Sequence, residues 1–307
     1  MIGQVVELAS PGVTIQKRLG HLEVAAPDGK TSVDLDSVGA VVLSAPQAVV
    51  TRSILDELSR RSIPVLVCGS NYLPSAILVP AYNKKDTAEL IRAQVDASRP
   101  TVKRIWQAIV REKIGSQATV LKARGNHKGA KRLNAIAPTV KSGDPSNREA
   151  YAAKLYWREL FGGDFHRDRN SAGINALLNY GYSILRSAVA RGLAGVGLAL
   201  SLGVHHSAAR NAMCLVDDMM EPFRPAVDLL VSRIVDNGQT ELAPSSKAEL
   251  AEVLVADVQG ARGVTTLQNG LWEFAASFAE TLLDSQRALR FPKLVGVDDA
   301  SADSIGV

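Results

Sequence analysis

Residues 86–112 read DTAELIRAQVDASRPTVKRIWQAIVRE, and the pattern of the chain changes at this stretch. Apolar residues recur here at helical spacing: Ile91, Val95, Val102, Ile105 and Ile109. This spacing predicts a helix with one apolar face. Pro100 predicts a break within it, because proline removes a backbone donor. A long helical region is therefore expected to begin near residue 86.

The preceding stretch, residues 1–85, is rich in short strand patterns. Residues 26–29, Ala-Pro-Asp-Gly, have turn chemistry, and residues 38–43 form a nearly continuous apolar run. Residues 51–61 have helical spacing. The loop after Leu43, SAPQAVVT, contains no glycine, so it cannot supply the phosphate-cradling turn of a nucleotide-binding βαβ unit. Short strands separated by turns favour a small antiparallel sheet instead.

Residues beyond 112 continue the helical pattern, with few clusters of β-branched residues. Further helices are predicted at 116–124, 146–160, 172–191, 207–219, 222–235, 247–258 and 264–286. We therefore predict an α+β fold of two domains. A small β-rich N-terminal domain, residues 1–85, precedes a larger all-α domain, residues 86–292. Residues 293–307, rich in Ser, Ala and Asp, are expected to form a flexible tail.

The composition is that of a folded chain, since 46% of its 307 residues are hydrophobic and 21% are charged. Its two cysteines, Cys68 and Cys214, lie far apart, as expected in a reducing compartment. The N-terminus lacks the basic and apolar regions of a secretory signal. No apolar run reaches the roughly 18 residues that span a bilayer. We expect a cytoplasmic protein that does not enter a membrane.

Positive charge is concentrated in one segment, although the net charge of the chain is only +4. Between Thr101 and Gly143 the chain carries ten lysines and arginines and one glutamate, a net charge of +9. Such a segment attracts polyanions, because neutralising phosphates releases condensed counterions. A solvated helix face beside a charged loop is the alternative. The candidate nucleic-acid contacts are Lys122, Arg124, Lys128, Lys131 and Arg132.

Three places in the helical region offer metal ligands, and Glu149 is the first. It lies in GDPSNREAYAAKLYW, residues 143–157. Ser146 could cap a helix here, and Glu149 would then complete a capping box, which is the structural alternative to catalysis. Ala152 and Ala153 are small neighbours on the same helix face, so another helix or a phosphate could approach the carboxylate closely.

The second place is the pair His205 and His206, which follows Gly203. Adjacent residues on a helix point about 100° apart. The two imidazoles are therefore not expected to serve one ion. One of them could be a ligand while the other packs against the protein or binds phosphate, so His205 is kept as an accessory candidate.

The third place is DDMMEPFRP, residues 217–225. Asp218 and Glu221 are three residues apart, a spacing that stacks two carboxylates on one helix face. Like charges repel there, and a divalent cation would remove that repulsion. Arg224 follows one turn later as an accessory candidate for binding phosphate.

These ligands and the basic segment together indicate phosphodiester chemistry. Carboxylates and imidazole bind Mg²⁺ or Mn²⁺, and the imidazole favours Mn²⁺. A cation bound to a bridging phosphate polarises it and stabilises the leaving oxyanion. The sequence contains no Ser/His/Asp cue, no GxSxG motif and no P-loop. The pattern leaves open whether water or a nucleic-acid 3′-hydroxyl attacks.

At these residues the sequence resembles the CRISPR-associated integrases that capture new spacers, especially those of type II systems. Four segments carry the resemblance: GDPSNREAYAAKLYW from Gly143, NALLNYGYSILR from Asn175, GVHH from Gly203 and DDMMEPFRP from Asp217. The family's pattern of Glu, Gly-x-x-His and Asp-x-x-Glu implies three catalytic metal ligands: Glu149, His206 and Glu221. Asp218 is then an accessory carboxylate.

The resemblance also implies an architecture and partners. Residues 1–85 would be a dimerisation domain, residues 86–292 the catalytic domain, and the protein a homodimer. The implied partner is a small ferredoxin-like CRISPR-associated protein that bridges two dimers. In the implied reaction the 3′-hydroxyl of a short DNA duplex attacks a phosphodiester at the leader–repeat boundary of a CRISPR array, and metal-dependent endonuclease cleavage accompanies it.

Two other functions are compatible with the same residues. The first is a non-catalytic basic DNA-binding protein, in which Glu149 is only a helix cap. The second is a metal phosphoesterase that acts on a small substrate. It would explain the carboxylates but not the basic segment.

Overall fold

The N-terminal part of the chain forms two small β-sheets. The computed structural model describes residues 4–27, 29–61, 63, 65–70, 74–78 and 87–295. The first sheet has the order β1-β5-β7-β8, with strands Gln4–Leu8, Val38–Leu43, Val65–Cys68 and Pro74–Leu78. The second has the order β4-β3-β2-β6, with strands Gly29–Asp34, His21–Ala26, Thr14–Arg18 and Val49–Val50.

The first sheet is mostly parallel, and the prediction of an antiparallel sheet is wrong there. Strands β1, β5 and β7 run parallel, helix α1 (Arg52–Arg60) connects β5 to β7, and β8 pairs antiparallel with β7. Strand β5 is buried along nearly its whole length, which is typical of a parallel strand covered on both faces. The prediction holds in the second sheet, where β2, β3 and β4 pair antiparallel.

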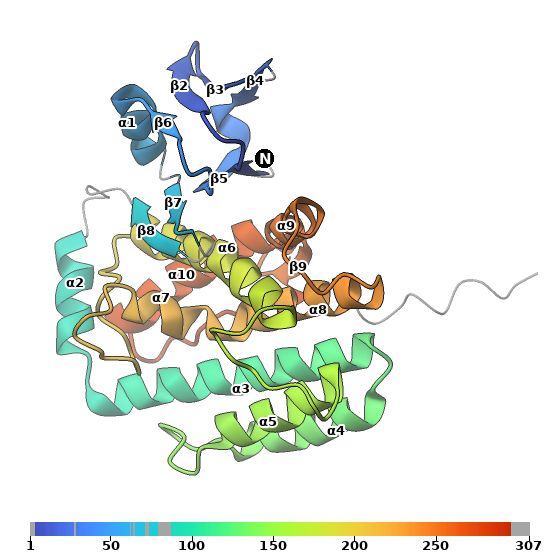
Figure 1. The fold of residues 1–307 in the computed structure, drawn as a ribbon. Helices are drawn as coiled ribbons and strands as arrows, with labels where there is room; N and C mark the ends of the chain where they lie inside the picture. The colour runs from blue at the N-terminus through green and yellow to red at the C-terminus, as the bar shows by residue number, and fades with distance from the viewer. Residues whose placement is uncertain are drawn as a thin grey trace, which may run out of the picture.

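Helices form most of the remaining chain. They are α2 (Thr87–Asp96), α3 (Arg99–Ala123), α4 (His127–Ile136), α5 (Arg148–Phe161), α6 (Ile174–Gly195), α7 (Cys214–Met219), α8 (Arg224–Asp236), α9 (Pro244–Ala251) and α10 (Leu267–Leu283), with 3₁₀ turns that include η3 (Glu221–Phe223) and η4 (Glu252–Val255). Figure 1 shows the N-terminal strands at one end of the molecule and α4 and α5 packed along the long helix α3. No helix in the described part of the chain is long and apolar enough to cross a membrane.

Helix α3 is the long helix that the spacing in residues 86–112 predicts. The side chain of Ser98 accepts a hydrogen bond from the backbone N–H of Thr101 and caps the helix. Pro100 falls in the first turn, where a helix needs no proline N–H. The predicted break therefore separates α2 from α3. The helix predicted separately at 116–124 is the last part of α3.

The all-α prediction for residues 86–292 is wrong in one region, because a third sheet lies within it. This sheet has the order β10-β9-β11, with strands Gly263–Thr266, Asp257–Gly260 and Lys293–Leu294. The helices predicted at 247–258 and 264–286 each include residues of this sheet. Val264, Thr265 and Thr266 are β-branched residues, which favour a strand at this place.

Three predicted boundaries differ from the structure or fall outside the described residues. Lys293–Leu294 pairs with β9, so the tail predicted at 293–307 is wrong for these residues, and 296–307 lie outside the described residues. The helix predicted at 207–219 begins only at Cys214, as α7. The predicted domain boundary near residue 85 falls within 79–86, which also lie outside the described residues.

Helix α6 connects the helical part to the first sheet. It is buried along most of its length and packs against α7, α8, α9 and α10. Nη1 of Arg191 donates a hydrogen bond of 2.7 Å to the carbonyl of Gly39 in β5. The hydroxyl of Tyr180 donates to the carboxylate of Glu7 in β1. The same helix therefore contacts the sheet and, as described below, carries residues of the candidate site.

Gly181 allows α6 and α8 to approach closely, and alanine there should destabilise the fold. A Cβ atom at Gly181 would lie 2.4 Å from Cγ1 of Val227, so Gly181→Ala should lower the free energy of unfolding by about 1–3 kcal/mol. Gly115 of α3 is the matched control, because a Cβ there meets nothing within 4 Å. Gly115→Ala should raise that free energy by up to about 1 kcal/mol through helix propensity. Urea unfolding measures both changes, and equal stability of the two variants would contradict this packing.

Candidate active site

Glu149 lies in the first turn of α5, but another residue caps this helix. The two carboxylate oxygens of Asp144 accept hydrogen bonds from the backbone N–H groups of Arg148 and Glu149, each 2.9 Å long. Asn147 precedes the helix in the left-handed conformation, with φ 49°. The predicted Ser146 cap and capping-box role of Glu149 are therefore wrong, because Asp144 already accepts the free N–H groups. The Glu149 carboxylate points to α3 instead.

The carboxylates of Glu149 and Glu221 meet at one ammonium group. Nζ of Lys113, on α3, lies 2.6 Å from Oε1 of Glu149 and 2.6 Å from Oε2 of Glu221. Nε of Arg224 lies 2.9 Å from the other carboxylate oxygen of Glu221. The structure thus brings two of the three predicted ligands, Glu149 and Glu221, to a single position. The ammonium group of Lys113 occupies that position.

Lys113 and Glu221 stay charged because the opposite charges beside them outweigh the effect of burial. The side chains of Lys113 and Glu221 are 14% and 11% exposed. Burial lowers the pKa of Lys113, but the nearby carboxylates outweigh burial and raise the pKa overall. Burial raises the pKa of Glu221, but Arg224 and Lys113 outweigh it and hold this pKa at about 2. A low-dielectric position of this kind strengthens the attraction between carboxylates and a cation.

Asp218 holds the loop that carries His206. Its fully buried carboxylate accepts hydrogen bonds from the backbone N–H groups of Val204 at 2.7 Å, His205 at 2.8 Å and His206 at 3.2 Å. The same carboxylate lies 2.5 Å from Nδ1 of His206. Nε2 is then the ring nitrogen left for a metal or a phosphate, an arrangement that orients metal-binding histidines. Gly203 is required in this tight turn, because a Cβ there would lie 2.3 Å from the carbonyl oxygen of His206.

The two adjacent histidines have different surroundings. The ring of His205 stacks on Trp106 of α3, with centroids 4.0 Å apart and planes 2° from parallel. The ring of His206 stands at 88° to both and lines a pocket. His205 therefore packs against the protein, whereas His206 faces the pocket. This agrees with the expectation that two adjacent histidines do not serve one ion.

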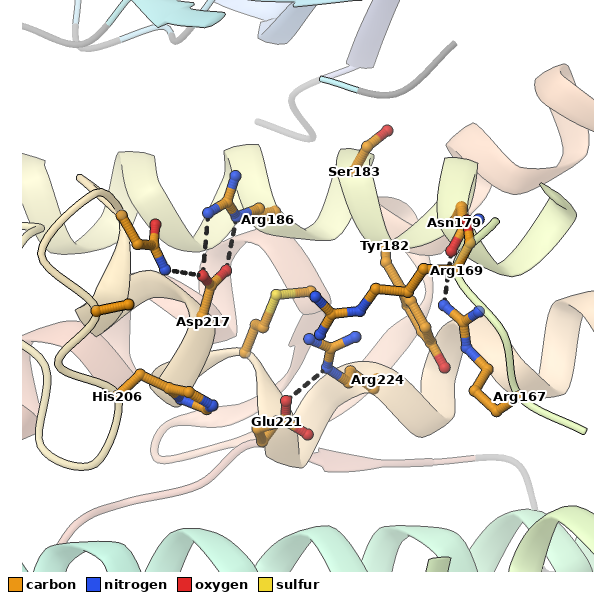
Figure 2. A pocket seen from close by; sticks show the side chains of 13 residues that line it. Arg167, Arg169, Asn179, Tyr182, Ser183, Arg186, His206, Asp217, Glu221 and Arg224 are labelled. Atoms are coloured by element: carbon orange, nitrogen blue, oxygen red, sulfur yellow. Dashed lines mark hydrogen bonds and ion pairs between the residues drawn. The ribbon is translucent and has the colours of Figure 1, made fainter. Parts of the chain in front are cut away.

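A cavity of about 560 Å³ lies beside these residues. Figure 2 shows His206 and Glu221 with guanidinium groups on this pocket. The arginines that line it are Arg167, Arg169, Arg186 and Arg224. A pocket with four guanidinium groups suits a ligand that carries phosphate.

Neighbouring side chains fix two of these arginines in place. Nε of Arg186 lies 2.7 Å from Asp217, and its Nη2 makes a second bond of 3.1 Å to the same carboxylate. Nη2 of Arg167 donates a hydrogen bond of 2.6 Å to Asn179, and its Nη1 donates one of 2.9 Å to Asn175. Both groups are therefore oriented before a ligand arrives (Figure 2).

Asp218 and Glu221 do not form the stacked pair that their spacing predicts. Asp218 binds the histidine loop, whereas Glu221 binds Lys113 and Arg224. Helix α7 ends at Met219, and the 3₁₀ turn η3 begins at Glu221. The change of helix type turns the two carboxylates to different partners.

The donor atoms fit a Mg²⁺ or Mn²⁺ ion. Two carboxylates and one imidazole are ligands that these ions accept, and the carboxylates of Glu149 and Glu221 already share one cation position. Among the described residues, however, no three His, Cys, Asp or Glu side chains group closely enough to hold an ion. His206 lines the same pocket as Glu221 without joining the two carboxylates in such a group.

The basic segment is less positive in the fold than in the sequence. Arg124 pairs with Asp236, and Arg132 pairs with Glu159 at 3.2 Å. Lys113 of the same segment is buried with the two glutamates. Lys122, Lys128 and Lys131 are exposed. The exposed lysines of α4, Lys128 and Lys131, are therefore the stronger candidates for contacts with nucleic acid.

Sequence reasoning did not identify several of these residues. The place of Lys113 in the basic segment does not indicate its contact with the two glutamates, and no motif indicates the stacking of Trp106 on His205. Asp144 follows Gly143 in a loop, a common place for a capping side chain, so it could have been identified. Arg167 and Arg186 have no spacing that relates them to the acidic residues.

A buried carboxylate on α8, that of Asp228, binds two tyrosine hydroxyls, and one of these tyrosines, Tyr182, lines the pocket. Asp228 is 1% exposed and accepts hydrogen bonds from the hydroxyls of Tyr156, at 3.0 Å, and Tyr182. The guanidinium of Arg224 lies 4.6 Å from the centre of the Tyr182 ring. Burial raises the pKa of Asp228 to about 7, although the tyrosine hydrogen bonds and nearby arginines oppose this shift.

Solved structures of known proteins share this fold. A casposase bound to an integration product has a TM-score of 0.81 and 18% sequence identity, over 97% of this chain and 96% of that one. A chain of a Cas6-RT-Cas1–Cas2 complex has a TM-score of 0.70 and 19% identity, over 92% of this chain and 35% of that one. The fold is therefore one found in CRISPR-associated proteins and casposases.

Sequence comparison identifies the family. The model of the CRISPR associated protein Cas1 family matches residues 6–257. The CRISPR-associated endonuclease Cas1 of Neisseria meningitidis serogroup C (strain 8013) is 34% identical over 267 residues, which cover 86% of this chain and 88% of that protein. The chain belongs to the Cas1 family.

The raised pKa of Asp228 predicts that this group destabilises the fold as the pH rises. Above pH 4 the unfolded chain releases the proton, whereas the native protein keeps it until about pH 7. The stability of the wild type relative to Asp228→Asn should fall by about 2–3 kcal/mol between pH 5 and pH 8. Urea unfolding of both proteins at the two pH values tests this, since other titrating groups cancel in the difference. A difference that does not change with pH would show that Asp228 is ionised throughout.

Proposed function

We propose that this chain is a metal-dependent DNA endonuclease and integrase of CRISPR adaptation. It inserts short foreign DNA fragments into a CRISPR array by attack of a fragment's 3′-hydroxyl on a phosphodiester bond. The observation that carries the proposal is the convergence of Glu149 and Glu221 on one cation position, beside a pocket lined by His206 and arginines. A relative named as an endonuclease and a casposase of the same fold bound to an integration product support it.

The protein's own residues prepare the site for this chemistry. Asp218 fixes the ring of His206 through Nδ1 and leaves Nε2 for a ligand. Arg224 neutralises one oxygen of Glu221 and leaves the other for a cation. Mg²⁺ or Mn²⁺, held by Glu149, His206 and Glu221, would polarise the phosphate under attack and stabilise the leaving oxyanion.

Phosphate binding is the proposed task of the arginines and the exposed lysines. Arg186 and Arg167 are held in place by Asp217 and by Asn179, so they can bind a phosphate without losing much conformational freedom. The lysines on α4 would bind the flanking DNA through its backbone. Such contacts position the nucleic acid without reading its sequence.

We further propose two assemblies. Residues 1–85 would mediate a homodimer, and the dimer would bind a small ferredoxin-like CRISPR-associated protein. The support for the second partner is a chain of this fold in a Cas6-RT-Cas1–Cas2 complex. The substrates are short DNA duplexes and the leader–repeat junction of a CRISPR array.

Glu149→Gln tests the catalytic site. It should lower strand transfer of a labelled short duplex into a plasmid, with Mn²⁺ present, by about 100-fold or more. Binding of the duplex should change little, because the basic surface is kept. The matched control is Glu159→Gln on the same helix, where the carboxylate binds Arg132 instead; its strand transfer should equal that of the wild type. Unchanged product with both Glu149→Gln and His206→Ala would refute the site assignment.

Removing the charge of the exposed lysines of α4 should change the salt dependence of DNA binding. A double variant, Lys128→Gln with Lys131→Gln, should weaken binding of a duplex and reduce the slope of log K against log salt by about 2. The control variant is Lys30→Gln with Arg60→Gln, which removes two exposed charges from the N-terminal part and should leave the slope unchanged. A salt titration by fluorescence anisotropy measures both. Equal slopes in the two variants would exclude α4 from the DNA-binding surface.

A further inference from the structure

Lys113 occupies the position at which the two glutamates converge. Its ammonium group lies 2.6 Å from each carboxylate, and its side chain is only 14% exposed. The carboxylates come from α5 and from η3, whereas the lysine comes from α3. The ammonium of Lys113 therefore links α3 to α5 and to η3 through ion pairs.

Lys113 supplies one positive charge to two carboxylates. Arg224 supplies a second positive charge, but of the two glutamates it contacts only Glu221. Within the part of the chain that the structure describes, Lys113 is therefore the cationic partner of Glu149, at 2.6 Å. A divalent ion at the same position would carry twice the charge of the ammonium. The ion and the ammonium repel each other strongly at such short range, particularly in a buried place.

We propose that Lys113 is a tethered counterion that a divalent ion displaces. It holds Glu149 and Glu221 together before the ion binds, and it lowers the affinity of the site for the ion by competing for the same two carboxylates. The inference rests on the proposed function, because it takes these two glutamates as metal ligands. It assigns Lys113 as a positioning residue that sets the metal concentration at which the site becomes occupied.

The proposal predicts that one substitution destabilises the protein when metal is absent and not when metal saturates the site. Lys113→Met keeps the length of the side chain and removes the charge. In EDTA this variant should melt at a lower temperature than the wild type, because two buried carboxylates then face each other without a cation. With saturating Mn²⁺ its melting temperature should return to the wild-type value, because the ion supplies the missing charge.

Calorimetric titration with Mn²⁺ alone, without DNA, measures the competition directly. Lys113→Met should bind Mn²⁺ about tenfold more tightly than the wild type, or better. Lys113→Arg, which keeps the positive charge, should stay near the wild-type affinity. Lys154→Met on α5 is the control, because this lysine is exposed, and it should change neither the affinity nor the melting temperature in EDTA.

The outcomes separate this inference from the proposed function. If the wild type binds Mn²⁺ and Lys113→Met binds it no more tightly, the counterion role is wrong while the metal site remains. If neither protein binds Mn²⁺ at millimolar concentration, both the inference and the metal-dependent function fail. A variant that folds only when Mn²⁺ is present supports the inference. A Lys113→Met protein that folds in neither condition overturns it, because Lys113 would then be a structural residue that an ion cannot replace.

Discussion

The rest of the site depends on a buried ammonium group between two carboxylates. Lys113 of α3 contacts Glu149 of α5 and Glu221 of η3, so one charge fixes the relative positions of three segments. Removing one partner of a buried ion pair leaves an uncompensated charge, which is far more costly than losing an exposed pair. Lys113 therefore compensates charge on both glutamates, and Arg224 adds a second contact to Glu221.

A second constraint acts on the histidine loop. Asp218 is fully buried, and its carboxylate is satisfied by backbone N–H groups from residues 204–206 and by the His206 ring. A buried carboxylate needs such donors, so the loop closes around it. Gly203 makes this closure possible because any side chain there would collide with the loop itself. The imidazole is thereby oriented by backbone geometry, and His205 adds a stacking contact with Trp106.

The helical part of the fold was more predictable than the sheets. Apolar spacing located α3 and most of α5, α6, α8 and α10, because a repeating face is a local property of the chain. The parallel order of β1, β5 and β7 and the small third sheet were missed. Strand pairing joins distant residues, and short apolar runs look alike whether their neighbours are parallel or antiparallel. The capping of α5 was also assigned to the wrong residue, since Asp144 reaches the helix from four residues upstream of Arg148.

The sequence by itself determined the change from strands to helices near residue 86, the acidic and histidine motifs, and the resemblance that family membership confirms. It also named Glu149, His206 and Glu221 as candidates. Only the tertiary structure decided how their charges are paired. In the fold Asp218 binds the histidine loop, whereas Glu221 binds Lys113. Arg124 is paired with Asp236, and Arg132 is paired with Glu159. The reason is that periodicity reports which residues share a face of one helix, whereas an ion pair depends on distance in space between segments that are remote in the chain.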